Sequence, residues 1–378
     1  MVPVGTTRNV GPACPRVLRA SAVFPKALAA VAYSFLDRET FPEPRAAATL
    51  GDGVAAVAAY CHRMTFAFES TTDDVLDGID LSGRRFVITG AASGLGEEST
   101  RALAAHGASI LMLARDPQKN TDAAERVRAT VPDADLTLDT VDLADLASVR
   151  AFAGRYVESG TPIDVLMNNA GVMACPFEHT ADGFEMQFGT NHLGHFELTR
   201  LLEPAVLAGD DPRIVILSSA AHGIADVDLG DPNFERTEYD AWEAYGRSKS
   251  ANALHALALS QRLDGVLSLS VHPGGIMTNL GRHLNDDLLQ QMLDRAKERS
   301  EAAGESGGMQ FKSVPQGAAT QVWAATSPDL IGHNGAYLAD CGVGVEGGNI
   351  GTNGFAPYIA DAGTADRLWS LSEQLVAG

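Results

Sequence analysis

The sequence predicts an α/β protein built on a doubly wound parallel sheet of about seven strands, with helices on both faces. Short apolar runs alternate with longer helical patterns from about residue 84 to the C-terminus. Most of these runs are apolar at nearly every position, as in parallel strands covered on both faces. A hydrophobic content of 45% over 378 residues supplies a large core. Alternation of strands and helices requires crossover connections, which favour a parallel sheet.

Seven segments are predicted to be strands: residues 84–89, 109–113, 136–141, 165–167, 213–218, 267–271 and 335–338. The stretch EESTRALAAHG after the first of them predicts a helix that ends near Gly107, because glycine favours the conformation that terminates helices. The glycine-rich run at 342–354 is predicted to be a loop.

The first 63 residues differ in charge from the rest of the chain. They carry seven basic and four acidic side chains, a net charge of +3, whereas the remaining 315 residues carry −23. We predict a flexible or loosely docked extension at 1–63 and a single domain at 64–378. A targeting segment, or a natural start at Met64, is the alternative. No run of 18 apolar residues occurs, so no transmembrane segment is predicted.

The composition excludes several function classes. A net charge of −20 argues against nucleic acid and against anionic membrane surfaces as partners. Both are negatively charged and bind proteins in which Lys and Arg outnumber Asp and Glu. The four cysteines are scattered, which predicts no disulfide framework, no metal site and a cytoplasmic location. His192 and His195 form an HxxH pair without the glutamate of a metalloprotease motif, so they are not predicted to bind metal.

A glycine-rich turn follows the first predicted strand and opens a helix. It reads TGAASGLG, and Gly90, Ser93, Gly94, Leu95 and Gly96 are its candidate cofactor-binding residues. Glycine permits the tight turn and lets backbone N–H groups approach a phosphate at the helix N-terminus. A strand–turn–helix context favours dinucleotide binding over an ordinary turn.

The end of the second strand predicts which dinucleotide is bound. Many such sheets place an acid there to hold the ribose hydroxyls of NAD, but this chain has Arg115, with Lys119 nearby. A guanidinium suits a 2′-phosphate, so NADP(H) is preferred over NAD(H). The alternative is a solvated basic turn.

Two further strand ends carry candidate cofactor contacts. After the third strand, Asp142 and Leu143 could hold the adenine, although Asp142 could equally cap the next helix. After the fourth strand, Asn169, Ala170 and Gly171 are small enough to let a cofactor lie against the backbone. Taken alone, NNAG is an ordinary turn sequence.

The pair Tyr245 and Lys249 occurs in YGRSK, in a chain with only five lysines. Positions i and i+4 share one face of a helix. A neighbouring ammonium would lower the phenol's pKa and make it a proton donor near neutral pH. The alternative is a surface tyrosine beside a solvated lysine.

The order of these motifs resembles the short-chain dehydrogenase/reductase family: TGxxxGxG, NNAG, a serine after the fifth strand, YxxxK and a following PG. The stretches FEMQFGTNHLGHFELT, SSAAH, YGRSKSANAL and VHPGGIMTNL resemble the branch containing retinol dehydrogenases, WW-domain oxidoreductases and protochlorophyllide reductases. The resemblance extends from about Thr65 to the C-terminus. It implies a Rossmann-type fold and an NAD(P)-dependent oxidoreductase acting on CH–OH groups.

The resemblance also implies a catalytic set. Tyr245 would transfer the proton of the substrate oxygen. Lys249 would lower the pKa of Tyr245 and bind the nicotinamide ribose. Ser219 would orient the carbonyl, whereas Ser218 would point elsewhere on the alternating strand. Asn191 would support a water-linked proton relay.

Around the nicotinamide, the resemblance implies a second group of residues. Pro273, Gly274 and Ile276 would surround the ring, and Thr278 would bond its carboxamide. The domain at 64–378 would therefore bind NADP(H) as a single Rossmann-fold unit.

The segment at 279–312 is predicted to be a substrate lid. Leu284, Leu288, Leu289 and Met292 form an amphipathic stripe at the carboxyl end of the sheet, where ligands bind. The stripe suggests a bulky apolar substrate, although plain packing would produce the same pattern. Residues 223–242 are predicted to be a loop near the substrate mouth, and Trp242 is either core or pocket wall.

The leading functional hypothesis is an NADP(H)-dependent oxidoreductase that interconverts an apolar alcohol and an aldehyde or ketone. One alternative is a carbon–carbon double-bond reductase of the protochlorophyllide reductase type. Another is a non-catalytic NADP(H)-sensing protein, because fold alone does not establish activity. The expected partner is a small molecule, and a homo-oligomer is left open.

Overall fold

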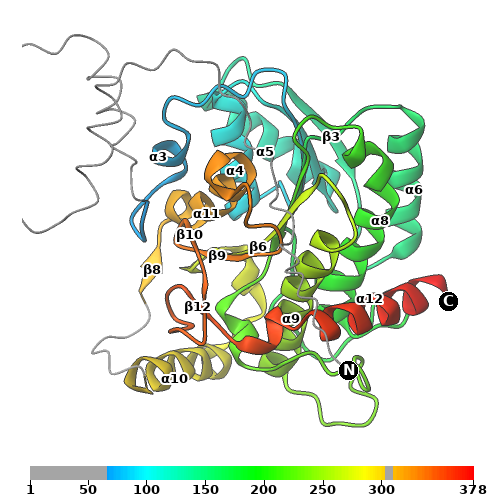
Figure 1. The fold of residues 1–378 in the computed structure, drawn as a ribbon, viewed down its shortest axis with the longest axis vertical. Coiled ribbons are helices and arrows are strands. Elements are labelled where there is room, and N and C mark those ends of the chain that lie inside the picture. Colours follow the sequence, from blue (N-terminus) through cyan, green and yellow to red (C-terminus); the bar gives the residue numbers. More distant parts are fainter. Residues whose placement is uncertain (1–65, 303–309) are drawn as a thin grey trace, which may run out of the picture. The chain divides into compact units, whose positions relative to one another are not determined.

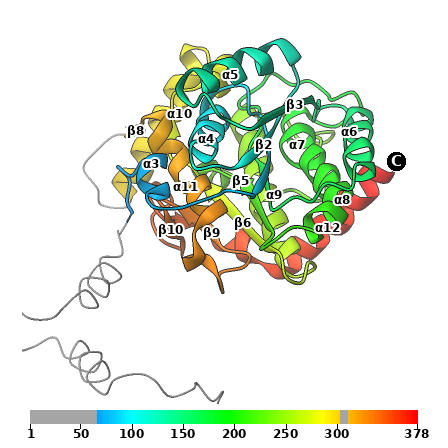
Figure 2. The same cartoon turned by 90° about the horizontal axis from the view of Figure 1, so that it is seen from above.

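The computed structural model describes residues 66–302 and 310–378 of the chain. The predictions for residues 1–63 lie outside these ranges. In Figures 1 and 2, a mainly parallel sheet lies between two layers of helices. This architecture confirms the predicted fold class.

The central sheet has eight strands in the order β10-β9-β6-β5-β4-β1-β2-β3. They are β1 (Arg85–Thr89), β2 (Ser109–Ala114), β3 (Leu136–Thr140), β4 (Val165–Asn168), β5 (Arg213–Leu217), β6 (Leu267–His272), β9 (Tyr337–Ala339) and β10 (Gly342–Val343). The first seven confirm the seven predicted strands, and all of their pairings are parallel.

The eighth strand comes from the run that was predicted to be a loop. β10 pairs antiparallel with β9 at the edge of the sheet. The same run contains β11 (Val345–Glu346), which pairs with β12 (Gly354–Phe355), so the loop prediction is wrong at these residues. A strand of two residues is too short to show a periodicity, which is why the sequence does not reveal it.

Helices cover both faces of the sheet (Figure 2). On one face lie α3 (Thr72–Leu76), α4 (Gly94–Ala105), α5 (Pro117–Thr130) and α11 (Val314–Thr326). On the other lie α6 (Leu146–Glu158), α8 (Gly194–Leu207), α9 (Ala241–Ser260) and α12 (Ala362–Ala377). The remaining described helices are α7 (Met186–Phe188), α10 (Asp286–Ala302), the π-helix η1 (Gly189–Leu193) and the 3-10 helices η2 (Ala220–Gly223), η3 (Asn279–His283), η4 (Pro328–Leu330) and η5 (Pro357–Ala360). The remaining strands are β7 (Gly275–Ile276) and β8 (Phe311–Lys312).

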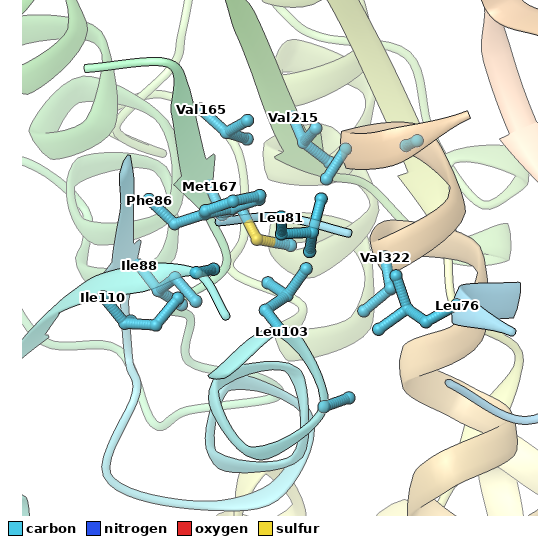
Figure 3. Close-up of a cluster of buried hydrophobic side chains, with 14 of the residues drawn as sticks. Leu76, Leu81, Phe86, Ile88, Leu103, Ile110, Val165, Met167, Val215 and Val322 are labelled. Carbon is cyan, nitrogen blue, oxygen red and sulfur yellow. The ribbon is translucent and has the colours of Figure 1, made fainter. Parts of the chain in front are cut away.

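Strand β1 shows why the strands are apolar at successive positions. Phe86 and Ile88 belong to the core cluster beneath α4 and α11, part of which is drawn in Figure 3. Val87 points to the opposite face and joins the cluster beneath α6 and α8. Because neighbouring side chains alternate between faces, burial on both faces requires continuous apolarity.

The position of β1 in the sheet locates the ligand crevice. β1 lies between β2, which follows it along the chain, and β4. The chain order reverses at this point, and in open α/β sheets a crevice forms there beyond the carboxyl ends of the strands. The glycine turn, NNAG and the adjacent serines all follow carboxyl ends of these central strands.

Three buried histidines lie in the layer formed by η1, α8 and α9. The ring centroids of His192 and His255 are 5.5 Å apart, and His195 lies one turn along from His192. Burial lowers the pKa of His192 to about 3, that of His195 to about 4, and that of His255 well below 6.5. All three are therefore neutral in the folded protein near pH 7.

We expect the free energy of unfolding to decrease as the pH falls below 6.5, because the unfolded chain then binds protons that the folded histidines exclude. Each histidine contributes a slope of about 1.4 kcal/mol per pH unit. Urea unfolding between about pH 7 and pH 5 measures this. His255→Phe should reduce the slope, whereas His333→Gln, at an exposed site, should leave it unchanged. Equal slopes in all three proteins would contradict the prediction.

Candidate active site

A cavity of about 840 Å³ opens at the carboxyl ends of the central strands. It is lined by every predicted cofactor-binding residue except Gly96, and by Ser219, Tyr245 and Lys249 of the predicted catalytic set. Asn191 is fully buried behind this lining. Predicted site residues from distant parts of the sequence thus meet at one cavity.

The glycine turn forms the floor of one end of the cavity. Gly90 and Gly94 have φ of +67° and +58°, which glycine adopts without strain. A Cβ atom on Gly96 would lie 2.3 Å from the carbonyl oxygen of Gly90, so no larger residue fits there. Ser93 is the N-cap of α4, but its side chain makes no capping hydrogen bond to the helix. Ser93, Gly94 and Leu95 all line the cavity, so the N-terminus of α4 opens onto it.

The NNAG turn packs directly against the glycine turn. Asn169 Nδ2 donates to the carbonyl oxygen of Thr89 at 2.7 Å, and the Thr89 hydroxyl accepts from the backbone N–H of Asn169 and Ala170. A Cβ atom on Gly171 would lie 3.2 Å from Asn191 Oδ1 and 3.7 Å from Lys249 Nζ. The small residues therefore join the two turns to the catalytic set.

Arg115 lies at the end of β2, exposed and on the cavity wall. Within residues 66–302 and 310–378 it forms no ion pair. In contrast, Lys119 Nζ lies 3.9 Å from Asp116 Oδ2, and Arg126 Nε lies 2.7 Å from Glu97 Oε1. Arg126 also lines the cavity and was not predicted, because it lies far along α5 from any motif. Arg115 is thus a cation without a carboxylate partner in the described chain.

Asp142 and Leu143 line the cavity next to this basic corner. Asp142 Oδ1 accepts from the backbone N–H of Ala144 at 3.0 Å and does not cap α6. The cap is Asp145, whose side chain accepts from the N–H of Ala147 at 2.9 Å. The alternative that Asp142 caps the helix is wrong, because the helix begins three residues later than the sequence pattern suggested.

Helix α9 presents Tyr245 and Lys249 on one face. Lys249 Nζ lies 5.6 Å from the centroid of the Tyr245 ring and donates to the carbonyl oxygen of Leu217 at 2.9 Å. Ser219 is hydrogen-bonded to Tyr245. Ser218 instead donates to the carbonyl oxygen of Lys249 at 2.8 Å. The two serines diverge as the strand alternation predicted.

The predicted direction of the Tyr245 pKa shift is wrong. Burial raises the pKa of Tyr245 to about 12, and the hydrogen bond with Ser219 only partly opposes the rise. Burial also lowers the pKa of Lys249 to about 7. Both groups lose hydration of their charged forms, and a lysine that is half neutral near pH 7 has little charge with which to acidify the phenol.

Asn191 lies in the π-helix η1, a local widening that often occurs at functional sites. Its Oδ1 accepts from the N–H of Val172 at 2.8 Å, and its Nδ2 donates to the carbonyl oxygen of Val172 and to Ser248 Oγ. The side chain thereby ties the NNAG loop to α9. Its backbone carbonyl lies 2.9 Å from His195 Nδ1, and His195 Nε2 lies 2.9 Å from the Thr89 hydroxyl. The HxxH motif did not reveal this supporting role of His195.

The histidines are not arranged as metal ligands. His192 Nε2 lies 2.8 Å from Ser372 Oγ. In the part of the chain that the structure describes, no group of three His, Cys, Asp or Glu side chains could hold a metal ion. Each helix in the same residues is too short or too polar to cross a bilayer.

The opposite wall of the cavity comes from the segment after β6. Pro273, Gly274, Ile276 and Thr278 all line it. Gly274 has φ +97°, and a Cβ atom there would lie 2.9 Å from Lys312 Cδ. Thr278 caps η3 and lies close to Gly94 across the cavity. The predicted nicotinamide and phosphate residues therefore face one another.

The apolar end of the cavity is formed by α9 and α10. Leu284, Leu288 and Met292 pack against the cluster of Trp242 and Tyr245. Trp242 is 3% exposed and also lines the cavity, so it is both core and pocket wall. Leu289, the fourth residue of the predicted stripe, is half-buried outside this cluster.

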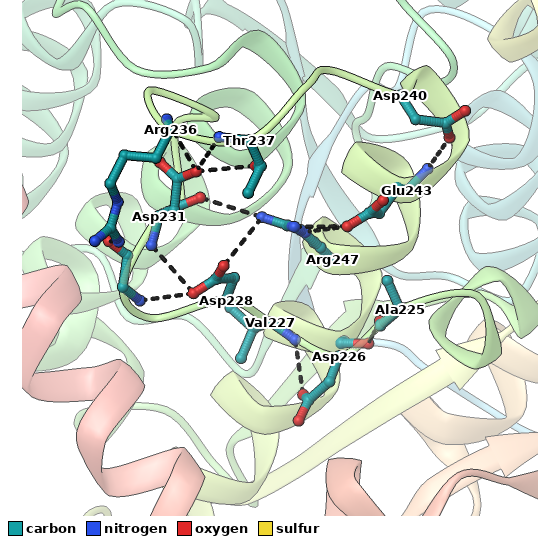
Figure 4. Close-up of polar contacts among 12 residues, drawn as sticks. Ala225, Asp226, Val227, Asp228, Asp231, Arg236, Thr237, Asp240, Glu243 and Arg247 are labelled. Carbon is teal, nitrogen blue, oxygen red and sulfur yellow. Dashed lines mark hydrogen bonds and ion pairs between the residues drawn. The ribbon is translucent and has the colours of Figure 1, made fainter.

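The predicted loop at 223–242 is a loop only at 224–240, because its first residue belongs to η2 and its last two to α9. Polar contacts hold it, as Figure 4 shows. The Asp231 carboxylate accepts from three successive backbone N–H groups, those of residues 235–237. The Arg247 guanidinium donates to the Asp231 carbonyl and to Glu243 Oε1. Because Arg247 lies between Tyr245 and Lys249 in sequence, these contacts also fix the helix that carries them.

Comparison with known proteins agrees with this geometry. The family model for short chain dehydrogenases matches residues 84–289. The short-chain dehydrogenase TIC 32 B, chloroplastic, of Brassica napus is 38% identical over 81% of this chain and 93% of its own. The chain belongs to the short-chain dehydrogenase family. It is an oxidoreductase with the NAD(P)-binding fold of that family.

Two further relatives of this short-chain dehydrogenase support the predicted branch and fold. Retinol dehydrogenase 14 of Mus musculus is 37% identical, and the match covers 78% of this chain and 86% of that protein. The crystal structure of an uncharacterised protein from Mycobacterium paratuberculosis has a TM-score of 0.60 and 34% identity. That match covers 80% of this chain and 97% of the other.

Proposed function

We propose that the protein is an NADP(H)-dependent oxidoreductase that interconverts a bulky apolar alcohol with its aldehyde or ketone. The observation that carries the proposal is one cavity in which Ser219, Tyr245 and Lys249 lie between a glycine cradle and an apolar wall. When bound, the cofactor supplies or accepts the hydride. The residues of the chain would bind the cofactor and the substrate, orient the substrate oxygen and move the proton.

The residues around the glycine turn fit a dinucleotide. Gly96 leaves no room for a side chain, and the N-terminus of α4 with the Ser93 hydroxyl would hold the pyrophosphate. Arg115 would bind the 2′-phosphate. Asp142 and Leu143 would contact the adenine, and Thr278 the carboxamide.

Tyr245 would give its proton to the substrate oxygen, which Ser219 would orient. With a pKa of about 12, the phenol is protonated at neutral pH, so it is ready to donate without prior ionisation. Lys249 would replace the lost proton, and Asn191 would hold the loop against which Lys249 lies.

The direct test is the loss of reduced-nicotinamide absorbance when NADPH or NADH is supplied with a panel of apolar aldehydes and ketones. Oxidation of NADPH that Tyr245→Phe abolishes would support the proposal. Turnover of a carbon–carbon double bond, with none of the carbonyls consumed, would replace it with the alkene-reductase alternative. NADPH binding without any turnover would favour the sensing protein.

Replacing Arg115 by Ala is expected to raise the KM for NADPH by about tenfold to a hundredfold, because a charge-assisted contact with a phosphate is lost. The KM for NADH should change by less than about twofold, because NADH has no 2′-phosphate. Steady-state kinetics with both cofactors measures this. Arg155→Ala removes an exposed guanidinium far from the cavity and is the matched control. Equal changes for NADPH and NADH would contradict the proposed role.

We also propose that residues 64–378 form one domain and that 279–312 act as a substrate lid. The packing of α10 on Trp242 and Tyr245 supports the lid, although residues 303–309 lie outside the described chain. A cytoplasmic location stays a prediction. It is consistent with the free thiols of Cys175 and Cys341, while the similar TIC 32 B is named as chloroplastic.

A further inference from the structure

The apolar end of the cavity carries an unexpected pair of cations. Arg282, in η3, and Arg295, in α10 (Figure 1), both line the cavity. Arg295 follows Leu288 and Met292 at the spacings i+7 and i+3, so it lies on the stripe that faces Tyr245. The apolar stripe continues in the buried Ala296, and the Arg295 guanidinium lies beside it on the cavity wall.

The position of Arg295 next to the reacting residues is given by its contact with α9. One of its terminal nitrogens lies 3.9 Å from Asp240 Oδ1. Asp240 is the N-cap of α9, five residues before Tyr245. Asp240 is already bonded to the N–H of Glu243 at 2.7 Å, and its side chain is 47% exposed. The ion pair is therefore long and solvated, and it leaves most of the guanidinium donors free.

Arg282 lies on the same side of the cavity. Its guanidinium donates to the carbonyl oxygen of Asn279 in its own turn at 3.2 Å. It also lies close enough to Cys175 to act on that thiol electrostatically. Cys175 directly follows Ala174, which belongs to the Trp242 and Tyr245 cluster. Two arginines from different elements thus border one apolar pocket.

Charge along the cavity is divided between its two ends. The carboxylates that line it are Glu97, Asp116, Asp122 and Asp142, and all lie on elements between β1 and α6. Lining residues from Leu217 onward include Lys249, Arg282 and Arg295 but no acid. Asp240 pairs with Arg295 but does not line the cavity, so the lining at this end carries a net positive charge, which favours an anion. Trp242 Nε1 adds a buried donor that has no acceptor among the described residues.

We propose that the substrate is an apolar carbonyl compound that carries a carboxylate, held by Arg295 and Arg282 while its carbonyl lies at Tyr245. The apolar stripe would bind the hydrocarbon, and the arginines would bind the carboxylate through charge-assisted hydrogen bonds. This inference rests on the proposed carbonyl reductase function and names its substrate class.

The test compares ω-oxododecanoic acid with its methyl ester as substrates of the full chain with NADPH. The two differ in the charge at one end and share the aldehyde. We expect kcat/KM to be at least about tenfold higher for the acid, since a tenfold ratio corresponds to 1.4 kcal/mol, within the range of a hydrogen bond to a charged group. Arg295→Leu and Arg282→Leu should each lower the acid-to-ester ratio, and the double variant should remove it. Lys297→Leu, which removes an exposed cation paired with Glu301 on the same helix, should leave the ratio unchanged.

Two results would overturn the proposal. One is a wild-type ratio near one. The other is a parallel fall of both rates in Arg295→Leu, which would mean that the arginine only holds α10 in place. If neither compound oxidises NADPH, the proposed function fails, but calorimetric titration of both compounds onto the NADPH-loaded protein still decides the binding claim. Tighter binding of the acid that Arg295→Leu abolishes would sustain it, and equal binding would reject it.

Discussion

Tyr245→Phe is expected to lower kcat/KM for carbonyl reduction by about a hundredfold to ten-thousandfold, the range that a positioned general acid contributes. The variant loses only the hydroxyl that is hydrogen-bonded to Ser219, and the ring keeps its packing against Trp242. The dissociation constant for NADPH should change little, because the ring still fills the same place in the wall. Steady-state kinetics and a fluorescence titration with NADPH measure the two quantities.

The matched control is Tyr156→Phe. Tyr156 lies on α6 and donates to the carbonyl oxygen of Pro162 at 3.3 Å, away from the cavity. Its loss should leave kcat/KM within about twofold of the wild type, as is usual for surface substitutions. A Tyr245→Phe protein that retained full activity with every carbonyl would refute the assigned proton donor.

Lys249→Met is expected to change activity and stability in opposite directions. Removing the ammonium should lower kcat/KM by about a hundredfold or more, because the proton that Tyr245 gives away is no longer replaced. The free energy of unfolding at neutral pH should increase, because a buried ammonium that has lost its hydration is replaced by an apolar chain of similar length. The carbonyl oxygen of Leu217 keeps a donor, since Asn252 Nδ2 bonds it at 2.8 Å.

The pH dependence separates this effect from a simple packing change. Burial lowers the pKa of Lys249 from 10.5 to about 7, so between these values the unfolded chain binds more protons and wild-type stability rises with pH. Lys249→Met should abolish that rise. Its free energy of unfolding should exceed that of the wild type most below about pH 7, where the folded lysine is charged. Urea unfolding at several pH values measures it, with Lys297→Met at an exposed site as control. A stability difference that does not vary with pH would show that Lys249 is not buried as a charge.

The sequence alone predicted the fold class and most of the residues that meet in the cavity. Seven of the eight sheet strands were predicted, because buried parallel strands are continuously apolar and need no tertiary information to be seen. The motifs that follow these strands must meet at one edge of the sheet, because parallel strands all end on the same side. For that reason Gly90, Arg115 and Tyr245 could be assigned to one cavity before any coordinates were known.

Only the tertiary structure decided what depends on burial and on contacts between distant segments. Whether Tyr245 is acidified or made less acidic depends on how many groups exclude water around it, and a spacing of four residues does not contain that information. The ties from Asn191 to Val172 and Ser248 join three elements that no local pattern connects. Likewise, Arg282 and Arg295 are ordinary surface residues in the sequence. The anion site that we propose for them exists only because the fold brings η3 and α10 to the same cavity.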